Sequence, residues 1–525
     1  MTDAQHMSQG AEPPKATRRD WLGLAVIALP CLLYAMDLTV LNLALPRISA
    51  DLRPSSAKLL WIVDIYGFFV AGLLVTMGNV GDRIGRRRLL LIGAAAFGVA
   101  SVVASMSRSA GMLIAARAVL GIAGATLAPS TLALIRNMFL DPRQRTAAIG
   151  VWISSYSVGG AIGPVLGGVM LQYFRWGSLF LLGVPVMVLL LIVGPIVLPE
   201  HRDPAARRID LVSAALSLAA VLAVTYAMKM FAQRGFGWLP LTSACLGLVI
   251  GGLFVVRQRR LVDPLIDLAL FRHPAFSAAL GTYLLATLVT FGSYVMVGQY
   301  FQLVLGLSPL GAGVWMLPWS ATYVLGSFLA PALARRFRPA VVMSGGLILA
   351  ACGFIMAMHA AQLGIGAFVV SSTIYSLGMS PVFTLSTDII VGAAPPERAG
   401  AAAAISETSS ELGGALGIAV LGSIATAVYR SGLGHAALVG VPSGVRAMAL
   451  DTLGGASAAA ALLPTDVART ALLGAAKASF TDALQVTFVI CAILSIATAI
   501  VAAFALRDRP ERDRITPAVP ASRLG

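Results

Sequence analysis

The stretch GNVGDRIGRRR, Gly78 to Arg88, decides how the fold is interpreted, because it joins two apolar runs. Gly78 lets a neighbouring helix approach closely. Asp82 can pair with basic groups of the loop or meet the positive end of a neighbouring helix. The arginine cluster that follows can anchor the loop to anionic lipid headgroups. An ordinary basic loop needs no such ordered set, so the stretch indicates a specialised connection at a membrane surface.

The composition outside this loop is that of a membrane protein. Of the 525 residues, 58% are hydrophobic and 12% charged, whereas soluble domains carry about 25% charged residues. Apolar runs recur along almost the whole length, each about long enough to cross ~30 Å of hydrocarbon as a helix. We therefore predict an all-α integral membrane protein rather than a large soluble helical one.

The apolar runs predict fourteen spans in a 6+2+6 order. The first six are 22–45, 59–80, 89–107, 110–134, 146–171 and 177–198, the next two are 210–231 and 239–256, and the last six are 275–302, 310–334, 340–359, 364–391, 401–426 and 483–506. The predicted units are a disordered cytoplasmic N-terminus 1–20, a six-helix bundle 21–198, two extra helices with linkers 199–274, a second six-helix bundle 275–506 and a cytoplasmic tail 507–525.

The net charge of +15 is placed in short loops. No basic stripe is interleaved with aromatic residues, which argues against nucleic-acid binding. Most Lys and Arg fall on one side of the predicted spans, and the positive-inside rule then puts both termini in the cytoplasm. We interpret the first apolar run as a signal anchor rather than a cleaved signal peptide.

The segment 427–481 is Ala-rich but interrupted by charges, and its longest uncharged run is too short for a span. Pro464-Thr465-Asp466 has the residues of a helix start. We therefore predict an external helical hairpin over 427–481. The four cysteines lie apart within apolar runs, which indicates neither disulfides nor a metal site.

Several carboxylates lie inside the predicted spans. Asp37, Asp64 and Arg117 sit roughly 9–12 Å below the outer membrane surface at 1.5 Å per residue. A buried carboxylate costs about 2.5–3.5 kcal/mol on insertion scales, which an ion pair would relieve. We therefore expect Arg117 to pair with Asp37 or Asp64, in a contact that protonation or a cationic substrate could break. A purely structural arginine bonded to backbone carbonyls is the alternative.

Aromatic residues flank one of these acids. Trp61, Asp64 and Phe68 fall on one helical face. An acid between aromatic rings suits a lipophilic cation, because charge attraction adds to cation–π contact. Alternatively, Trp61 belongs to the interfacial aromatic belt and Phe68 faces lipid.

A second acidic centre lies near the C-terminus. Glu407 and Glu411 are one helical turn apart in SETSSELGGALG, Ser406 to Gly417. Two carboxylates so close in a low dielectric should not both be ionised at pH 7, which suits a proton carrier. A helix-packing role for one of them is the alternative. Asp388 is a weaker candidate for proton coupling, because it lies near the inner end of its span.

Four stretches together resemble the major facilitator superfamily. Gly78 to Arg88 resembles its signature loop between helices two and three. LIAARAVLGIAGA (113–125) resembles its fourth-helix motif, and GAIGPVLGG (160–168) its fifth-helix antiporter motif. MDLTVLNLALP (36–46) is similar to the first-helix motif of the fourteen-helix drug:proton antiporter branch. The loop RRFRP (335–339) resembles a degenerate second copy of the signature loop.

The resemblance implies a major facilitator fold in the plasma membrane of a bacterium. It further implies proton-coupled efflux of lipophilic, mainly cationic compounds (quaternary ammonium compounds, dyes, antiseptics) by alternating access. We expect a multi-pass monomer whose partners are the bilayer, its small-molecule substrates and protons. The residues that match its gating and structural motifs are Gly78, Asp82, Arg83, Gly85, Arg86, Gly159, Gly163, Pro164 and Gly167.

Two other functions stay open: a non-pumping transporter-like sensor or lipid-handling protein, and a proton symporter for uptake. No lysine follows a glycine, so a phosphate-binding Walker loop is missing and an ATP-driven pump is excluded for this chain. No cofactor is expected beyond the proton gradient as the driving force. Nothing resembles a nucleophile–base pair, so we do not expect an enzyme.

Overall fold

The computed structural model describes residues 14–52, 54, 56–200, 202, 210–234, 237–261, 264, 266, 268–394, 399–436 and 441–506. In these residues the regular structure is helical throughout, which confirms the predicted all-α class. Eleven helices of the described part are long and apolar enough to cross a membrane. The predicted tail 507–525 and residues 1–13 of the predicted disordered N-terminus lie outside the described residues.

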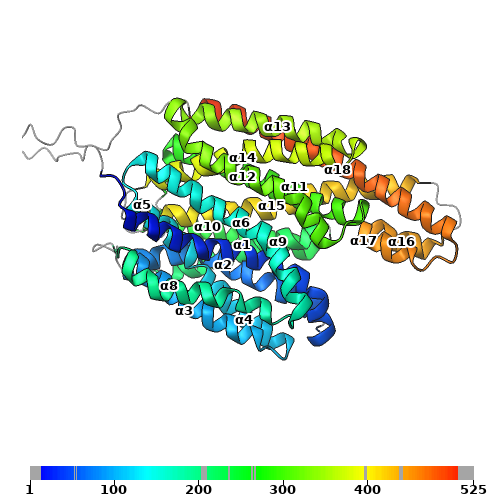
Figure 1. Cartoon of the computed structure of the whole chain (residues 1–525), viewed down its shortest axis with the longest axis horizontal. Coiled ribbons are helices and arrows are strands. Elements are labelled where there is room, and N and C mark those ends of the chain that lie inside the picture. Colours follow the sequence, from blue (N-terminus) through cyan, green and yellow to red (C-terminus); the bar gives the residue numbers. More distant parts are fainter. Residues whose placement is uncertain are drawn as a thin grey trace, which may run out of the picture.

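The helices fall into three groups along the chain (Figure 1). The first contains α1 (Arg18–Leu52), α2 (Ser56–Ile84), α3 (Arg86–Ser105), α4 (Ala110–Gly124), α5 (Leu127–Met138), α6 (Pro142–Tyr173), α7 (Ser178–Leu181) and α8 (Gly183–Val197). The second contains α9 (Leu211–Arg234) and α10 (Trp238–Arg260). The third contains η1 (Leu270–Arg272), α11 (Pro274–Gln299), η2 (Tyr300–Val304), α12 (Pro309–Arg336), α13 (Pro339–Leu363), α14 (Ile365–Ala393), α15 (Ala399–His435), α16 (Ser443–Asp451), α17 (Leu453–Ala460) and α18 (Asp466–Ala505).

Local chemistry sets where several helices begin. The Ser109 side chain accepts from Met112 N at the start of α4, and Asp141 accepts from Arg143 N at the start of α6. Such caps satisfy amide groups that the first helical turn leaves without a partner. Gly85 has a φ of 109° between α2 and α3, a conformation that favours glycine. The signature loop therefore turns sharply here, as its glycine allows.

The first and third groups pack against each other along two seams. On one side α6 contacts α12 and α14, and on the other α15 contacts α2 and α5. A Cβ on Gly150 of α6 would lie 2.7 Å from the Ser327 carbonyl oxygen of α12. The absence of a side chain at Gly150 therefore lets these two helices meet backbone to backbone.

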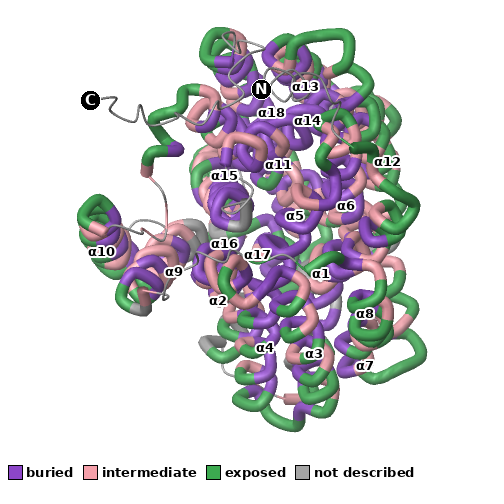
Figure 2. The backbone as a smooth tube through the Cα atoms, turned by 90° about the vertical axis from the view of Figure 1, so that its left-hand side faces the viewer, coloured by how far each residue is buried: buried purple, intermediate pink, exposed green. Residues whose placement is uncertain are grey.

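The second group stands beside the two bundles rather than inside either (Figure 2). Helix α9 packs on α10 and also contacts both α2 and α15. Val75 of α2 and Ala404 of α15 are buried in one cluster with Phe254 of α10, and Leu216 of α9 packs against it. The pair α9–α10 thus covers the α2–α15 seam from the side.

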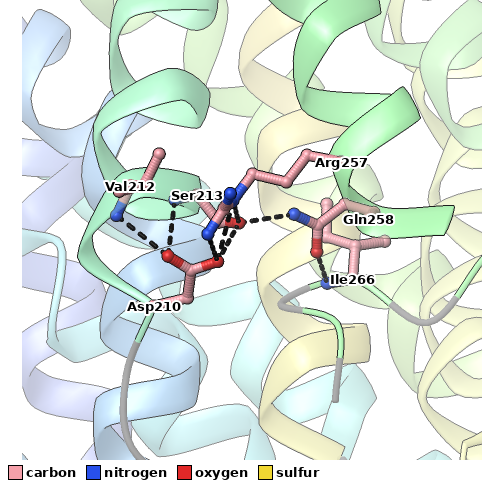
Figure 3. A network of polar contacts seen from close by, with 6 residues as sticks. All are labelled: Asp210, Val212, Ser213, Arg257, Gln258 and Ile266. Carbon is pink, nitrogen blue, oxygen red and sulfur yellow. Dashed lines mark hydrogen bonds and ion pairs between the residues drawn. The ribbon is translucent and has the colours of Figure 1, made fainter. Parts of the chain in front are cut away.

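A polar network ties the ends of α9 and α10 together (Figure 3). Asp210 accepts from the backbone N–H groups of Val212 and Ser213, and its Oδ2 lies 2.8 Å from Arg257 Nη2. Gln258 donates to the Ser213 hydroxyl at 2.7 Å and accepts from Ile266 N at 3.3 Å. The network therefore caps α9, pairs it with α10 and holds the linker that leads to the third group.

The segment 427–481 differs in part from the predicted hairpin. Helix α15 continues to His435 and α18 begins at Asp466, so both long helices reach into the segment, with α16 and α17 between them. Thr465 caps α18 by accepting from Ala468 N, which confirms the predicted helix start. The Tyr429 hydroxyl donates to Ala449 O at 2.9 Å and holds α16 on α15. The external location of the segment stays a prediction.

Candidate functional site

The first acidic centre joins α1 to α4. Arg117 Nη1 lies 3.5 Å from Asp37 Oδ2, and the arginine side chain is 1% exposed. The guanidinium carbon lies 5.2 Å from the ring centroid of Tyr66 on α2. The predicted pairing of Arg117 with Asp37 is thus confirmed as a contact. Within the described part of the chain Asp37 Oδ2 and Arg117 Nη1 make no hydrogen bond, so the two charges meet as a loose pair.

A small cavity adjoins this centre. It is lined by Asp37 and Met36 of α1, Phe97 and Ser101 of α3, and Phe180 of α7, among others. Its space for water is about 20 Å³, and a single water needs roughly 10–15 Å³ on this measure. The cavity therefore has room for about one water molecule beside the Asp37 carboxyl group.

The second acidic centre lies on α15 and reaches across to the first bundle. The Tyr34 hydroxyl of α1 donates to Glu411 Oε1 at 2.8 Å. The Tyr34 ring lies 5.9 Å from the ring of Tyr66 and 5.9 Å from that of Tyr156, between centroids. Tyr66 contacts Arg117, and Tyr34 contacts both Tyr66 and Glu411. Tyr34 therefore lies between the Asp37–Arg117 pair and the acids of the opposite bundle.

Glu407 is buried among tyrosines. It interacts electrostatically with Glu411, Tyr156 and Tyr283. In the described residues it forms no ion pair, unlike Asp37. The two predicted glutamates are thus confirmed as neighbours, whereas their part in proton coupling stays a prediction.

The predicted aromatic face on α2 is present in part. The rings of Trp61 and Phe68 lie 6.0 Å apart between centroids. Phe68 is buried and Trp61 exposed, so Phe68 does not face lipid whereas Trp61 keeps a position that suits the interface. The side chain of Asp64 lies outside the described residues, and its place between the two rings stays a prediction.

Asp388 has a partner that the sequence did not indicate. Its Oδ1 accepts from Arg145 Nε at 2.8 Å and its Oδ2 from the Thr146 hydroxyl at 2.9 Å. Nearby, Arg136 donates to the carbonyl oxygen of Ala394 at 3.2 Å. These contacts join the first turns of α6 and the end of α5 to the end of α14. Asp388 therefore holds the two bundles together, and its part in proton coupling stays a prediction.

The signature loop folds on itself and on α8. Asp82 forms an ion pair with the buried Arg86 side chain, and Arg86 Nη1 donates to Gly78 O at 3.0 Å. Glu200, just after α8, accepts from the backbone N–H of Arg87 at 3.2 Å. A Cβ at Gly85 would collide with the Glu200 carboxylate. Gly78, Asp82, Gly85 and Arg86 are brought together as expected, whereas Arg83 is exposed.

The glycines of the predicted α6 motif differ in what they pack against. A Cβ at Gly159 would collide with the Leu32 carbonyl group of α1, so Gly159 provides close packing within the first bundle. Gly163 and Gly167 are buried. The side chain of Pro164 lies outside the described residues. The close packing predicted for this motif is therefore confirmed at Gly159, and the sealing role of the motif stays a prediction.

The sequence interpretation missed Tyr34, Tyr66 and Tyr156, which link the acidic centres. Tyr34 precedes Asp37 by three residues and therefore shares its helical face, a signal that was present in the sequence. Arg145 was missed because the predicted span began at residue 146 and left Arg145 in a basic loop, where arginine is common, whereas the structure places it in the first turn of α6. Its partner Asp388 is 243 residues away, which no local pattern indicates.

Long apolar helices in two bundles, with paired charges buried between them, define the class of secondary membrane transporters. Residues 27–418 match the Major Facilitator Superfamily. The chain therefore belongs to the major facilitator superfamily and is a multi-pass membrane protein.

Several curated relatives match almost the whole chain. The multidrug efflux pump LfrA of Mycolicibacterium smegmatis is 43% identical over 94% of this chain and 98% of its own length. The methyl viologen resistance protein SmvA of Salmonella typhimurium is 34% identical over 88% and 93%. The tetracenomycin C resistance and export protein of Streptomyces glaucescens is 31% identical over 97% and 96%. These bacterial sources agree with the predicted bacterial plasma membrane.

Solved structures share the fold at low sequence identity. The human organic anion transporter MFSD10 aligns with a TM-score of 0.56 and 16% identity over 92% of this chain and all of its own. A bacterial homologue of the human lysosomal transporter Spinster, inward-facing and unoccupied, aligns with a TM-score of 0.55 and 17% identity over 96% and all of its own. Both comparisons support the transporter fold alone.

Proposed function

We propose that this protein is a proton-coupled exporter of lipophilic, mainly cationic compounds, such as quaternary ammonium compounds, dyes and antiseptics. It works by alternating access between two six-helix bundles. The pair α9–α10 brings the number of spans to fourteen, and both termini lie in the cytoplasm. The export function is supported by the names of the relatives, which are efflux and resistance proteins.

The observation that carries the proposal is the hydrogen bond from Tyr34 to Glu411. It connects a bundle with an ion-paired acid to a bundle with two neighbouring acids. Protonation of Glu411 removes the charge that this bond stabilises, and protonation of Asp37 removes the partner of Arg117. Binding of protons therefore changes contacts within and between the bundles, which is what coupling to a conformational change requires.

The same surroundings suit a lipophilic cation. Carboxylates attract its charge, and the rings of Tyr34, Tyr66 and Tyr156 supply aromatic faces for cation–π contact. A proton and a cation that compete for the same carboxylates cannot occupy them together. Entry of protons from outside then displaces the cation, which is the exchange that an antiporter performs.

The contacts of Asp388 stabilise a state that is closed toward the cytoplasm. Arg145 and Asp388 join α6 to α14 at the end of α14, which the charge distribution predicts to be cytoplasmic. Opening toward the cytoplasm must break this pair. The free energy that it contributes then biases the protein toward the inward-closed state.

The test is efflux of the fluorescent cation ethidium from energised vesicles, with an imposed pH gradient and with or without a protonophore. We expect Asp37→Asn to abolish gradient-driven efflux while the protein still inserts in the membrane. Asp466→Asn is the matched control, because that carboxylate is 91% exposed at the start of α18. Wild-type efflux by Asp37→Asn would refute the mechanism, and gradient-driven accumulation in the opposite direction would indicate uptake.

A further inference from the structure

A cavity of about 220 Å³ lies between α11, α15, α17 and α18, away from the residues assigned above to proton coupling. Short helices α16 and α17 stand beside the extended ends of α15 and α18 (Figure 1). Leu453 of α17 and Phe480 of α18 line the cavity and are buried. Helix α17, in the segment between α15 and α18, therefore supplies one wall of this cavity.

The cavity opens where two tightly packed helices separate. A Cβ on Gly292 of α11 would lie 2.8 Å from the Gly417 carbonyl oxygen of α15, so the two backbones touch there. A Cβ on Gly422, little more than one turn further along α15, would meet nothing within 4 Å. The space at Gly422 is thus bounded by the close contact at Gly417 on one side and by α17 on another.

The cavity continues the face of α15 that bears an acidic residue of the candidate site. Glu411, Ile418, Gly422 and Tyr429 follow one another at i, i+7, i+11 and i+18, and the last three line the cavity. Residues at this spacing share one side of a helix. Gly422 lies roughly 16 Å from Glu411 along the helix axis at 1.5 Å per residue. A compound that leaves Glu411 along this face reaches the cavity next.

The lining chemistry favours an aromatic guest. Phe480 and Tyr429 offer rings, and Met296 offers a polarisable thioether that packs against aromatic groups. Gln299 and Thr426 add groups that can hydrogen-bond with a substituent. No charged side chain belongs to the described lining. The volume is below the ~300–1,000 Å³ of pockets for whole drug-sized ligands, so it holds one part of such a compound.

We propose that this cavity is a second substrate subsite, which holds the aromatic part of an exported compound after it has left Glu411. The inference rests on the proposed export function. It gives the segment between α15 and α18 a role, because α17 closes the subsite on the side away from the acids.

The first test fills the cavity. Gly422→Leu and, separately, Ala425→Leu place a side chain in it, and Gly434→Leu is the matched control, since Gly434 is exposed on the same helix and a Cβ there meets nothing within 4 Å. We expect both cavity variants to raise the half-saturating ethidium concentration for efflux at least fivefold, and the control to stay within twofold of wild type. If the half-saturating ethidium concentration of both cavity variants equals that of wild type, the proposal is overturned.

The second test needs no change in cavity volume. Purified protein with Leu453→Cys is treated with a small water-soluble thiol reagent, and modification of that peptide is measured by mass spectrometry. We expect ethidium to slow the modification at least threefold. Val467→Cys, at a position 83% exposed, should be modified at a rate that ethidium does not change.

The outcomes separate this inference from the proposed function. If wild-type protein exports ethidium but ethidium leaves the modification of Leu453→Cys unchanged, the subsite is refuted while export stands. If phospholipid but not ethidium slows the modification, a lipid occupies the cavity and the subsite is again refuted. If wild-type protein exports no ethidium, the proposed function fails, and the inference fails with it.

Discussion

The two acidic centres hold their carboxylates in different ways. Asp37 faces the guanidinium of Arg117, whereas Glu407 lies among tyrosines and next to Glu411. Adding a proton to Asp37 costs an ion pair, whereas adding one to Glu407 removes repulsion between two acids. Burial alone therefore does not define a proton carrier, because the neighbouring groups decide which interactions protonation changes.

Removing the cation of the first centre should disturb the protein most. Arg117→Gln leaves Asp37 buried without its charge partner, which costs about 3–5 kcal/mol of stability for a buried pair. We expect a lower unfolding temperature in detergent and no gradient-driven ethidium efflux. The double variant Arg117→Gln/Asp37→Asn should recover most of the stability but not the efflux. If the single and double variants are equally stable, Arg117 does not stabilise the buried carboxylate of Asp37.

Substitutions in the second centre should change the pH dependence of efflux rather than the stability of the protein. Glu407→Gln and Glu411→Gln each remove one partner of the repelling pair, so the pH at which efflux is half-maximal should move in both. We expect efflux rates at the alkaline end of the profile to change about tenfold, a difference of about 1.4 kcal/mol. Efflux measured between pH 5.5 and 8.5 provides the comparison. Identical profiles in wild type and both variants would exclude the pair from proton coupling.

The link between the centres should have a smaller effect. Tyr34→Phe keeps the ring but removes a hydrogen bond to a carboxylate, a contact that contributes about 1.5–3 kcal/mol when charged. We expect efflux to fall about tenfold, with stable membrane insertion. Tyr66→Phe is the control, because the Tyr66 hydroxyl is buried and makes no hydrogen bond in the described residues. Equal losses in both variants would show that the hydroxyl of Tyr34 has no special part.

The smallest effect is expected at an exposed pair that serves as a reference. Asp51 at the end of α1 accepts from Arg175 Nη2 and Trp176 Nε1, both at 2.7 Å, and these bonds hold the pKa of Asp51 below its ordinary value. Because the pKa of Asp51 is lower in the folded state, the ionised carboxylate stabilises the folded protein at pH values above its unfolded-state pKa of about 3.9. This stabilisation is lost as the pH falls through the folded-state pKa. Unfolding temperatures between pH 3 and 6 should fall less steeply with acid in Asp51→Asn. An unchanged slope would show that the pair adds no stability.

Much of the fold followed from patterns along the chain. The apolar runs coincide with long helices, and Thr465 caps the start of α18 as its residue type indicates. The pairing of Asp37 with Arg117 could be predicted because both charges needed a partner at the same depth. The extension of α15 to His435 was missed, because Ala-rich sequence with scattered charges suits a membrane helix end and an external helix equally well.

The contacts between bundles could not be predicted. Tyr34 and Glu411 are 377 residues apart, and helical periodicity assigns each to a face without saying which helix that face meets. The position of Tyr34 three residues before Asp37 indicates a shared helical face, but it does not indicate that Glu411 is the partner. Asp388 was placed correctly near a helix end, but its partner Arg145 depends on how two distant helices cross.

The position of α9 has a consequence for how a membrane-dissolved compound meets this protein. Two seams run between the bundles, and α9 lies over the one formed by α2 and α15. A solute that approaches this side through the lipid therefore meets α9 before it meets the seam. The protein is therefore asymmetric in the plane of the membrane: α9 and α10 pack beside the α2–α15 seam, whereas the seam along α6 and α12 lies away from them.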